Sequence, residues 1–92
     1  MKVTEYCDAC NLQLIVTYYP NQRGRWSADF DRCETKENFE SSALTGTHGN
    51  GNSPSEAITD YVRKIRGKIL VRDAMRETRH EYVVPDHLGG VE

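Results

Sequence analysis

The fold is decided by the stretch Gly-Thr-His-Gly-Asn-Gly-Asn-Ser-Pro-Ser-Glu-Ala, residues 46–57, where a Gly- and Asn-rich segment runs into a helix-start signal. Ser53 can act as the N-cap of a helix, and Pro54 then falls at the first helical position, where its missing N–H has no partner to lose. Glu56, three residues after Ser53, can reach back to complete a capping box. The stretch therefore predicts a mobile polar loop that ends at a helix N-terminus.

A helix is predicted from Pro54 to about Arg66, because apolar residues recur there at steps of three and four and so share one helical face. The residues on that face are Ala57, Ile58, Tyr61, Val62 and Ile65. The opposite face is charged and is expected to be solvated. Gly67 is expected to end the helix, since glycine readily adopts the left-handed conformation that follows a helix C-terminus.

Strands are predicted on both sides of this helix. Before it, the β-rich run 12–19 and the alternating run 26–30 flank a turn that contains Pro and Gly, so the two runs are expected to pair as a hairpin. After it, short strands are predicted at 69–71 and 82–84, with a charged loop at 72–79 between them.

Two weaker runs, 33–37 and 42–45, can extend the sheet. The order of strands, one helix and strands is typical of the α+β class. The sequence therefore predicts a single domain over residues 1–92, in which one helix packs on one face of an antiparallel sheet of about four strands. Residues 1–11 form a Cys-x-x-Cys segment before the first strand, and residues 86–92, with two glycines, are expected to fray.

Composition places the chain among small globular proteins. Its 92 residues are 37% hydrophobic and 28% charged, and the net charge is -2. This balance offers no overall attraction to nucleic acid or to anionic membranes. The longest apolar runs are far shorter than the roughly 20 residues that cross a bilayer, and no signal-peptide pattern begins the chain. We expect a cytoplasmic protein without nucleic-acid or membrane partners.

Two segments together resemble a known family. Residues 24–30, Gly-Arg-Trp-Ser-Ala-Asp-Phe, and residues 51–57, Gly-Asn-Ser-Pro-Ser-Glu-Ala, are similar to the HicB-type antitoxin domain, which has a glycine, aromatic and alanine strand followed by a Gly-x-Thr/Ser-Pro-x-Glu-Ala helix start. The resemblance covers roughly residues 12–71. The continuation at 65–71 looks more like a set of small bacteriophage proteins that share this fold.

The resemblance implies a HicB-like fold that binds a protein partner. That fold is similar to a reduced ribonuclease H layout without its catalytic carboxylates, so the resemblance does not imply an enzyme. Two departures from the family pattern stand out: the chain after Phe30 lacks the usual proline and glycine corner, and residues 72–92 are too few and too charged to supply the separate DNA-binding domain of many members. Operator binding of the antitoxin kind is therefore not expected.

The three cysteines are candidate metal ligands. Cys7 and Cys10 have the spacing with which two thiolates bind zinc on a tight knuckle, and Cys33 is the obvious third ligand. The fourth ligand would be a histidine, namely His48, His80 or His87. Inert reduced thiols and a redox pair are the alternatives, so we expect either no cofactor or zinc.

The Gly- and Asn-rich loop is a candidate anion site, because successive backbone N–H groups and the positive end of the helix dipole can converge there. The candidate binding residues are His48, Gly49, Asn50, Gly51, Asn52 and Ser53. The loop lacks the Walker lysine and the dinucleotide glycine spacing, so it is neither a P-loop nor a Rossmann fingerprint. Glycines at such a position also serve a simple turn.

No catalytic constellation is recognisable, and we expect no enzyme. The leading expectation is a small protein-interaction module: a phage-encoded inhibitor or antitoxin-like binder of a host or toxin-like protein. Exposed strand edges favour a homodimer, because pairing across a two-fold axis buries apolar surface and hides the edge. The alternative is a protein that binds a small phosphate-bearing ligand or nucleotide at the loop before the helix.

Overall fold

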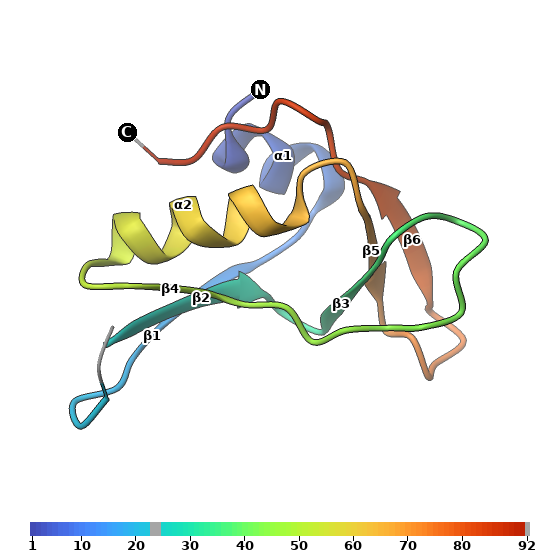
Figure 1. Ribbon diagram of the computed structural model, residues 1–92. Helices are drawn as coiled ribbons and strands as arrows, with labels where there is room; N and C mark the ends of the chain where they lie inside the picture. Colours follow the sequence, from blue (N-terminus) through green and yellow to red (C-terminus); the bar gives the residue numbers. More distant parts are fainter. Residues whose placement is uncertain (23–24, 92) are drawn as a thin grey trace.

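The computed structural model describes residues 1–22 and 25–91. The elements, in chain order, are α1 (Val3–Cys10), β1 (Leu14–Tyr18), β2 (Trp26–Phe30), β3 (Cys33–Lys36), β4 (Gly49–Gly51), α2 (Pro54–Ile65), β5 (Ile69–Arg72) and β6 (His80–Val83). These two helices and six strands of the described residues confirm the α+β class (Figure 1). The prediction of about four strands and one helix underestimates both.

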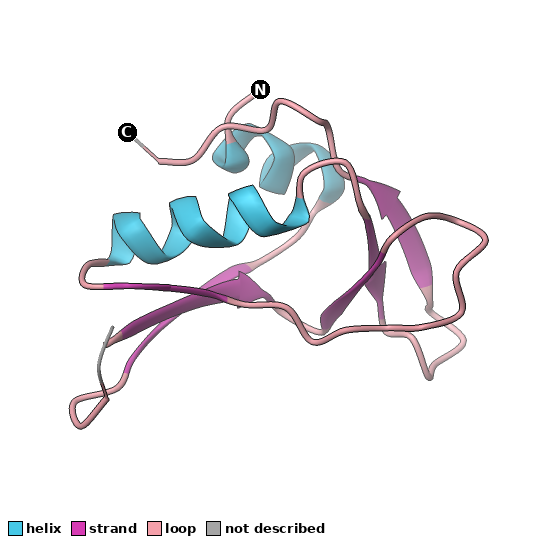
Figure 2. Ribbon diagram, in the orientation of Figure 1, coloured by secondary structure: helices cyan, strands magenta, loops and turns pink. Residues whose placement is uncertain are grey.

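The strands form two antiparallel sheets and not one (Figure 2). The first sheet has the order β1-β2-β4 and the second the order β3-β5-β6. The chain leaves the first sheet directly after Phe30, where Arg32 adopts a left-handed conformation with a φ of 59°. Because β3 then pairs with β5 and not with the hairpin, the single sheet predicted from the sequence is wrong.

The predicted hairpin is confirmed. β1 and β2 pair antiparallel with Val16 opposite Ala28, and the alternation of β2 buries Ala28 and Phe30 in the core. The turn expected between the two strands falls partly on residues 23–24, which lie outside the described residues together with Glu92.

The second sheet contains the other predicted strands. The runs 33–37, 69–71 and 82–84 correspond to β3, β5 and β6. The run 42–45 is not a strand: it contributes a single bridge between Thr45 and Thr35. The chain from β3 to β4 therefore crosses the edge of the second sheet as an irregular segment.

Helix α2 has the predicted bounds and buried face. Ser53 Oγ accepts a hydrogen bond from the Glu56 amide at 3.2 Å, and Gly67 follows the helix with a φ of 71°. The Glu56 carboxylate accepts from the Ser53 hydroxyl at 3.4 Å, so the side chain does not complete the capping box through the Ser53 amide. No helix within the described residues has the length and apolar character that a membrane span requires.

The glycines before α2 serve close packing. A Cβ on Gly49 would overlap the Ala57 carbonyl oxygen and the Tyr61 amide, and one on Gly51 would lie 2.6 Å from the Ala57 nitrogen. These two positions belong to β4, which pairs with β2. The mobile loop predicted for 46–53 is therefore wrong at its centre, because strand pairing and the close approach of α2 fix residues 49–51.

One hydrophobic core draws on both helices and both sheets. At its centre Tyr61 of α2 meets Phe30 of β2 edge to face, with 5.4 Å between the ring centroids. The Tyr61 hydroxyl accepts a hydrogen bond from the Phe30 amide at 3.1 Å, which satisfies a buried polar group. α2 is thereby fixed across one face of the first sheet, and the opposite face is left open (Figure 1).

The N-terminal segment 1–11 is helical, which the sequence analysis missed. Helix α1 buries Val3 and Tyr6 and ends at Asn11, whose φ is 53°. Cys7 and Cys10 lie in the second half of this helix, so the tight knuckle expected for them is wrong. A helical Cys-x-x-Cys places both thiols against the core.

The C-terminal residues are packed where the sequence predicted fraying. Leu88 is 0% exposed, and Gly89 pairs with Lys2 in a parallel bridge, so the two ends of the described chain lie side by side (Figure 1). The Arg66 side chain donates a hydrogen bond to the Leu88 carbonyl at 2.7 Å. The tail therefore completes the core beside α1.

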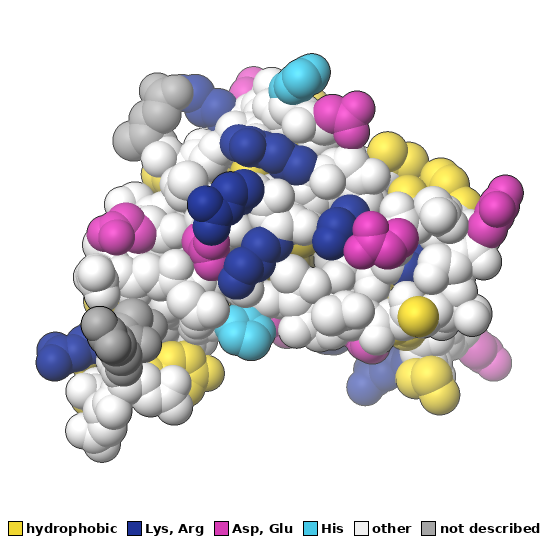
Figure 3. Space-filling model, in the orientation of Figure 1, with side chains coloured by type: hydrophobic (Ala, Val, Ile, Leu, Met, Phe, Trp, Pro, Cys, Tyr) yellow, Lys and Arg dark blue, Asp and Glu magenta, His cyan; other side chains and the backbone are white. Residues whose placement is uncertain are grey.

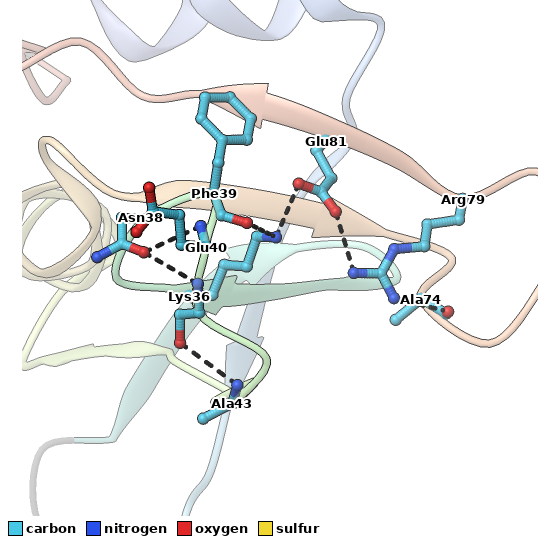
Figure 4. A network of polar contacts seen from close by, with 9 residues as sticks. Lys36, Asn38, Phe39, Glu40, Ala43, Ala74, Arg79 and Glu81 are labelled. Carbon is cyan, nitrogen blue, oxygen red and sulfur yellow. Dashed lines mark hydrogen bonds and ion pairs between the residues drawn. The ribbon is translucent and has the colours of Figure 1, made fainter.

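The outer face of the second sheet carries a buried ion pair. Lys36 is 6% exposed, and its Nζ lies 2.9 Å from a Glu81 carboxylate oxygen and donates to the Phe39 carbonyl at 3.1 Å (Figure 4). Arg79 contacts the other Glu81 oxygen at 3.0 Å. Every charge in this network has a partner, so we assign it to stability and not to ligand binding.

Candidate functional site

The open face of the first sheet gathers polar side chains from three strands. Ser27 of β2 stands opposite Thr17 of β1 and Asn50 of β4, which makes one row across the sheet. Strand alternation puts Asp29 of β2 on the same face, one step along. Burial raises the pKa of the Asp29 carboxyl group, and His48, which precedes β4, lies near enough to offset part of that rise.

These side chains surround a hollow of about 360 Å³. Its lining residues are Thr17, Tyr19, Gln22, Ser27, Asp29, His48 and Asn50. Hydroxyl, amide, carboxyl and imidazole groups therefore face one shared space. We call this space the sheet hollow.

Asp29 is the electrostatic centre of the sheet hollow. Burial raises the pKa of its carboxyl group, His48 lowers it and Asp31 raises it, and the net pKa lies above the usual 3.8. Within the described residues no hydrogen bond or ion pair reaches the Asp29 carboxylate. A half-buried carboxylate without a donor costs stability, which is a frequent property of binding sites.

The residues of the predicted anion loop are separated by the structure. His48 and Asn50 line the sheet hollow, whereas Gly49 and Gly51 are pressed against α2. Ser53 is occupied as the cap of α2. Asn52 is exposed. The six residues do not form one cradle, and the anion site stays a prediction.

Carboxylates already occupy the space around the start of α2. The Asn50 N–H donates to Asp60 at 2.9 Å, and Asp60 also pairs with Lys64 at 3.0 Å and with Arg63. Burial raises the pKa of the Asp60 carboxyl group, but these hydrogen bonds and charges outweigh it, so the net pKa is lowered. A second hollow of about 370 Å³ at this end of α2 is lined by Glu56, Asp60 and Arg63 among others, and because Arg63 is already paired with Asp60, an anionic ligand is disfavoured there.

The basic face of α2 is solvated, as predicted. Lys and Arg side chains gather over α2 in the space-filling view (Figure 3). Arg63 and Lys64 are bound to Asp60, and Lys64 also donates to the His48 carbonyl at 3.0 Å. Lys64 therefore connects α2 to the chain before β4, and both cations already have an anionic partner in Asp60.

The cysteines do not come together as a ligand set. All three are free thiols, and Cys7, Cys10 and Cys33 are half-buried against the core. Burial raises the pKa of the Cys33 thiol to about 11, and burial also raises the pKa of Cys7. Both thiols are therefore protonated at neutral pH, which disfavours a redox pair.

The described residues contain no group of three or more His, Cys, Asp or Glu side chains that could hold a metal ion. His80 and His87, the other proposed ligands, are exposed. His80 stacks on Tyr82 with 4.4 Å between the ring centroids. The zinc site thus stays a prediction without geometric support.

The outer edge of β1 is unpaired within the described residues, since β1 is the end strand of its sheet. Two hydrogen bonds fix which backbone groups face β2: the Tyr19 N–H donates to the Arg25 carbonyl at 2.6 Å, and the Asp31 N–H donates to the Gln13 carbonyl at 2.8 Å. Because backbone groups alternate between the two edges of a strand, the odd-numbered residues of β1 bond to β2.

The even-numbered residues of β1 therefore turn their N–H and C=O groups outward. These residues are Leu14, Val16 and Tyr18. The side chains along this edge are uncharged: Leu14 and Val16 pack on the side of α2, and Ile15 stands on the open side with Thr17. Tyr18 is 46% exposed and rests on the Trp26 ring at a centroid distance of 4.9 Å.

The sequence analysis named two residues of the sheet hollow, His48 and Asn50, and missed the others. The alternation of residues 26–30 nevertheless indicates which other residues share this face. In the alternating strand the core residues Trp26, Ala28 and Phe30 leave Ser27 and Asp29 on the opposite face. The hairpin then adds Thr17, which the register places beside Ser27.

Comparison of the chain with protein-family models, with curated proteins and with solved structures finds no match.

Proposed function

We propose that the protein is a non-catalytic interaction module that pairs with other proteins through the free edge of β1, and that two copies form a homodimer in this way. The observation that carries the proposal is the character of that edge. Residues 11–22 contain no charged side chain, in a chain that is 28% charged. Free edges are normally protected by charges, proline or bulges, and Leu14–Tyr18 has none of these.

The geometry of β1 supports a symmetric pairing. With Leu14, Val16 and Tyr18 facing outward, two antiparallel β1 strands fit about a two-fold axis at Val16. Val16 then stands opposite its own counterpart, and Leu14 opposite the counterpart of Tyr18. Each such pair exchanges two backbone hydrogen bonds, and the Leu14 and Val16 side chains of both copies meet on the side of α2.

The end strand of the second sheet is less suited to this role. The Val84 N–H donates to the Lys68 carbonyl at 2.9 Å. The backbone N–H and C=O groups of the preceding residue, Val83, therefore point to the free edge of β6. Its carbonyl already accepts a hydrogen bond from the Tyr6 hydroxyl at 2.9 Å. The backbone groups of Glu81 point to the same edge, and its side chain is charged and ion-paired. The β6 edge is therefore protected in the way that the β1 edge is not.

The identity of the partner draws on the sequence alone. The resemblance of residues 24–30 and 51–57 to the HicB-type domain supports an inhibitor or antitoxin-like role toward a host or toxin-like protein, in a phage setting. Three free thiols fit a reducing compartment such as the cytoplasm. The same β1 edge would accept either a second copy or a strand of that partner.

The test is the particle mass of the Val16→Pro variant. The Val16 N–H faces outward, so proline removes an edge donor without removing a bond to β2. Light scattering with size exclusion should give two chains of 10.5 kDa for the unmodified protein and one for Val16→Pro. Val83→Pro, the matched change on β6, should remain dimeric. A monomeric unmodified protein at high micromolar concentration, or a dimeric Val16→Pro, contradicts the proposal.

A further inference from the structure

We infer that the sheet hollow binds a protonated amine or guanidinium group, with the Asp29 carboxylate as its anionic partner. The hollow lies on the open face of the first sheet, away from α2, and is formed by β1, β2 and the residues around β4. This inference does not depend on pairing through β1.

Asp29 supplies a charge that no hydrogen bond or ion pair from the described residues compensates. It is half-buried, and within the described residues its carboxylate has neither a hydrogen-bond donor nor an ion-pair partner. None of the described residues that line the sheet hollow is Lys or Arg. The other nearby acid, Asp31, is exposed and lies 3.7 Å from Arg32. A cationic ligand would give Asp29 the charge-assisted bond that it lacks.

The neutral groups of the hollow complement a cation that carries several N–H donors. The Thr17 and Ser27 hydroxyls and the Asn50 side-chain carbonyl stand in one row beside Asp29, and each can accept a hydrogen bond. Tyr19, at the rim, is 43% exposed and presents a ring that can lie against a guanidinium plane. Guanidinium has five donors in a fixed plane and is matched by such a set of acceptors.

Anions and metal ions suit the same space poorly. An anion would face Asp29, and the backbone N–H that could receive it at Asn50 already donates to Asp60. Lys64, which contacts the His48 carbonyl at 3.0 Å, is also held by Asp60. A metal ion would need a third ligand, and no cluster of three such side chains exists within the described part of the chain.

The experiment is an NMR titration of the ¹⁵N-labelled protein with two cationic probes, agmatine and N-acetyl-arginine amide. Sodium phosphate and sodium chloride at matched ionic strength are the controls. We expect saturable shifts of the Ser27, Asp29 and Asn50 amides with a cationic probe and not with the salts. Asp29→Asn should weaken the binding about tenfold, as expected for loss of one charge-assisted bond. Asp31→Asn, two residues away, should leave it unchanged.

The two probes distinguish the sources of the cation. Both probes carry a guanidinium, and agmatine alone also has a primary ammonium group. Saturation by agmatine but not by capped arginine therefore identifies a free amine as the ligand, and saturation by capped arginine identifies an arginine side chain of a bound protein. The inference is overturned if neither probe saturates, if Asp29→Asn binds as well as the unmodified protein, or if phosphate produces the same shifts. Repeating the titration on Val16→Pro separates this result from dimer formation, because the hollow is intact in a single chain.

Discussion

At the residue scale, Asp29 has lost part of its hydration without gaining a hydrogen-bond donor from the described part of the chain. Its neighbour in sequence, Phe30, fills the core, while Asp29 itself faces the sheet hollow on the other side of the strand. Because a small protein is only marginally stable, a carboxylate in a strand that lowers the stability of the fold suggests a role in binding. The cationic ligand that we propose would account for its presence.

The substitution Asp29→Asn should therefore raise the melting temperature at pH 7. Burial raises the pKa of Asp29 in the folded state, so its ionised form opposes folding at neutral pH. A group with a raised pKa contributes stability at low pH and loses it as the pH rises through the folded pKa. The advantage of Asp29→Asn should accordingly shrink as the pH falls toward 3.8, the usual pKa of the group.

Thermal unfolding followed by circular dichroism between pH 3 and pH 8 measures this effect. Asp31→Asn is the control, because Asp31 is exposed and should change the free energy of unfolding by less than about 0.5 kcal/mol. A lower melting temperature for Asp29→Asn at pH 7 would show that Asp29 has a stabilising partner, and the account of the hollow would then be wrong.

At the element scale, the approach of β4 to α2 positions the hollow. Gly49 allows the strand to lie against the helix, and the pairing of β4 with β2 places Asn50 beside Ser27. The Asp60 carboxylate fixes the same strand by accepting from the Asn50 N–H. The same contacts therefore hold the start of α2, strand β4 and the sheet hollow in place.

The substitution Gly49→Ala should destabilise the protein by about 1–3 kcal/mol or more, because the added Cβ overlaps backbone atoms of Ala57 and Tyr61 that cannot rotate away. Gly46→Ala is the matched control, since a Cβ there meets nothing within 4 Å. Urea unfolding measures both variants. If Gly49→Ala is as stable as Gly46→Ala, β4 does not lie against α2 as described.

The sequence predicted α2 and the hairpin because their signals are local. Capping at Ser53, the apolar face of α2 and the alternation of β2 each depend on neighbours in the chain. Helix α1 had a local signal too, since Val3, Tyr6 and Cys10 repeat at helical spacing, but the Cys-x-x-Cys spacing suggested a zinc knuckle instead. β4 could not be predicted, because a Gly-Asn-Gly strand forms only where a partner strand and a helix hold it.

At the scale of the whole molecule, two small sheets share one core, and the ends of the chain close it. The division into two sheets depends on the left-handed turn at Arg32, a conformation that arginine rarely adopts and that no sequence pattern indicated. The sequence also did not show that His48 and Asn50 share a face of the sheet with Asp29, because both come from a segment that was predicted to be a loop. Within the described residues, β1 is an end strand whose free edge carries no charged side chain.

The most direct test of the account is the amide hydrogen exchange of β1 as a function of protein concentration. We predict that the Leu14, Val16 and Tyr18 amides, which face outward, exchange rapidly in dilute protein and become protected as the concentration rises, while the Ile15 and Thr17 amides are protected throughout by β2. Outward-facing amides that exchange rapidly at every concentration, in a sample whose mass is that of one chain, would contradict it.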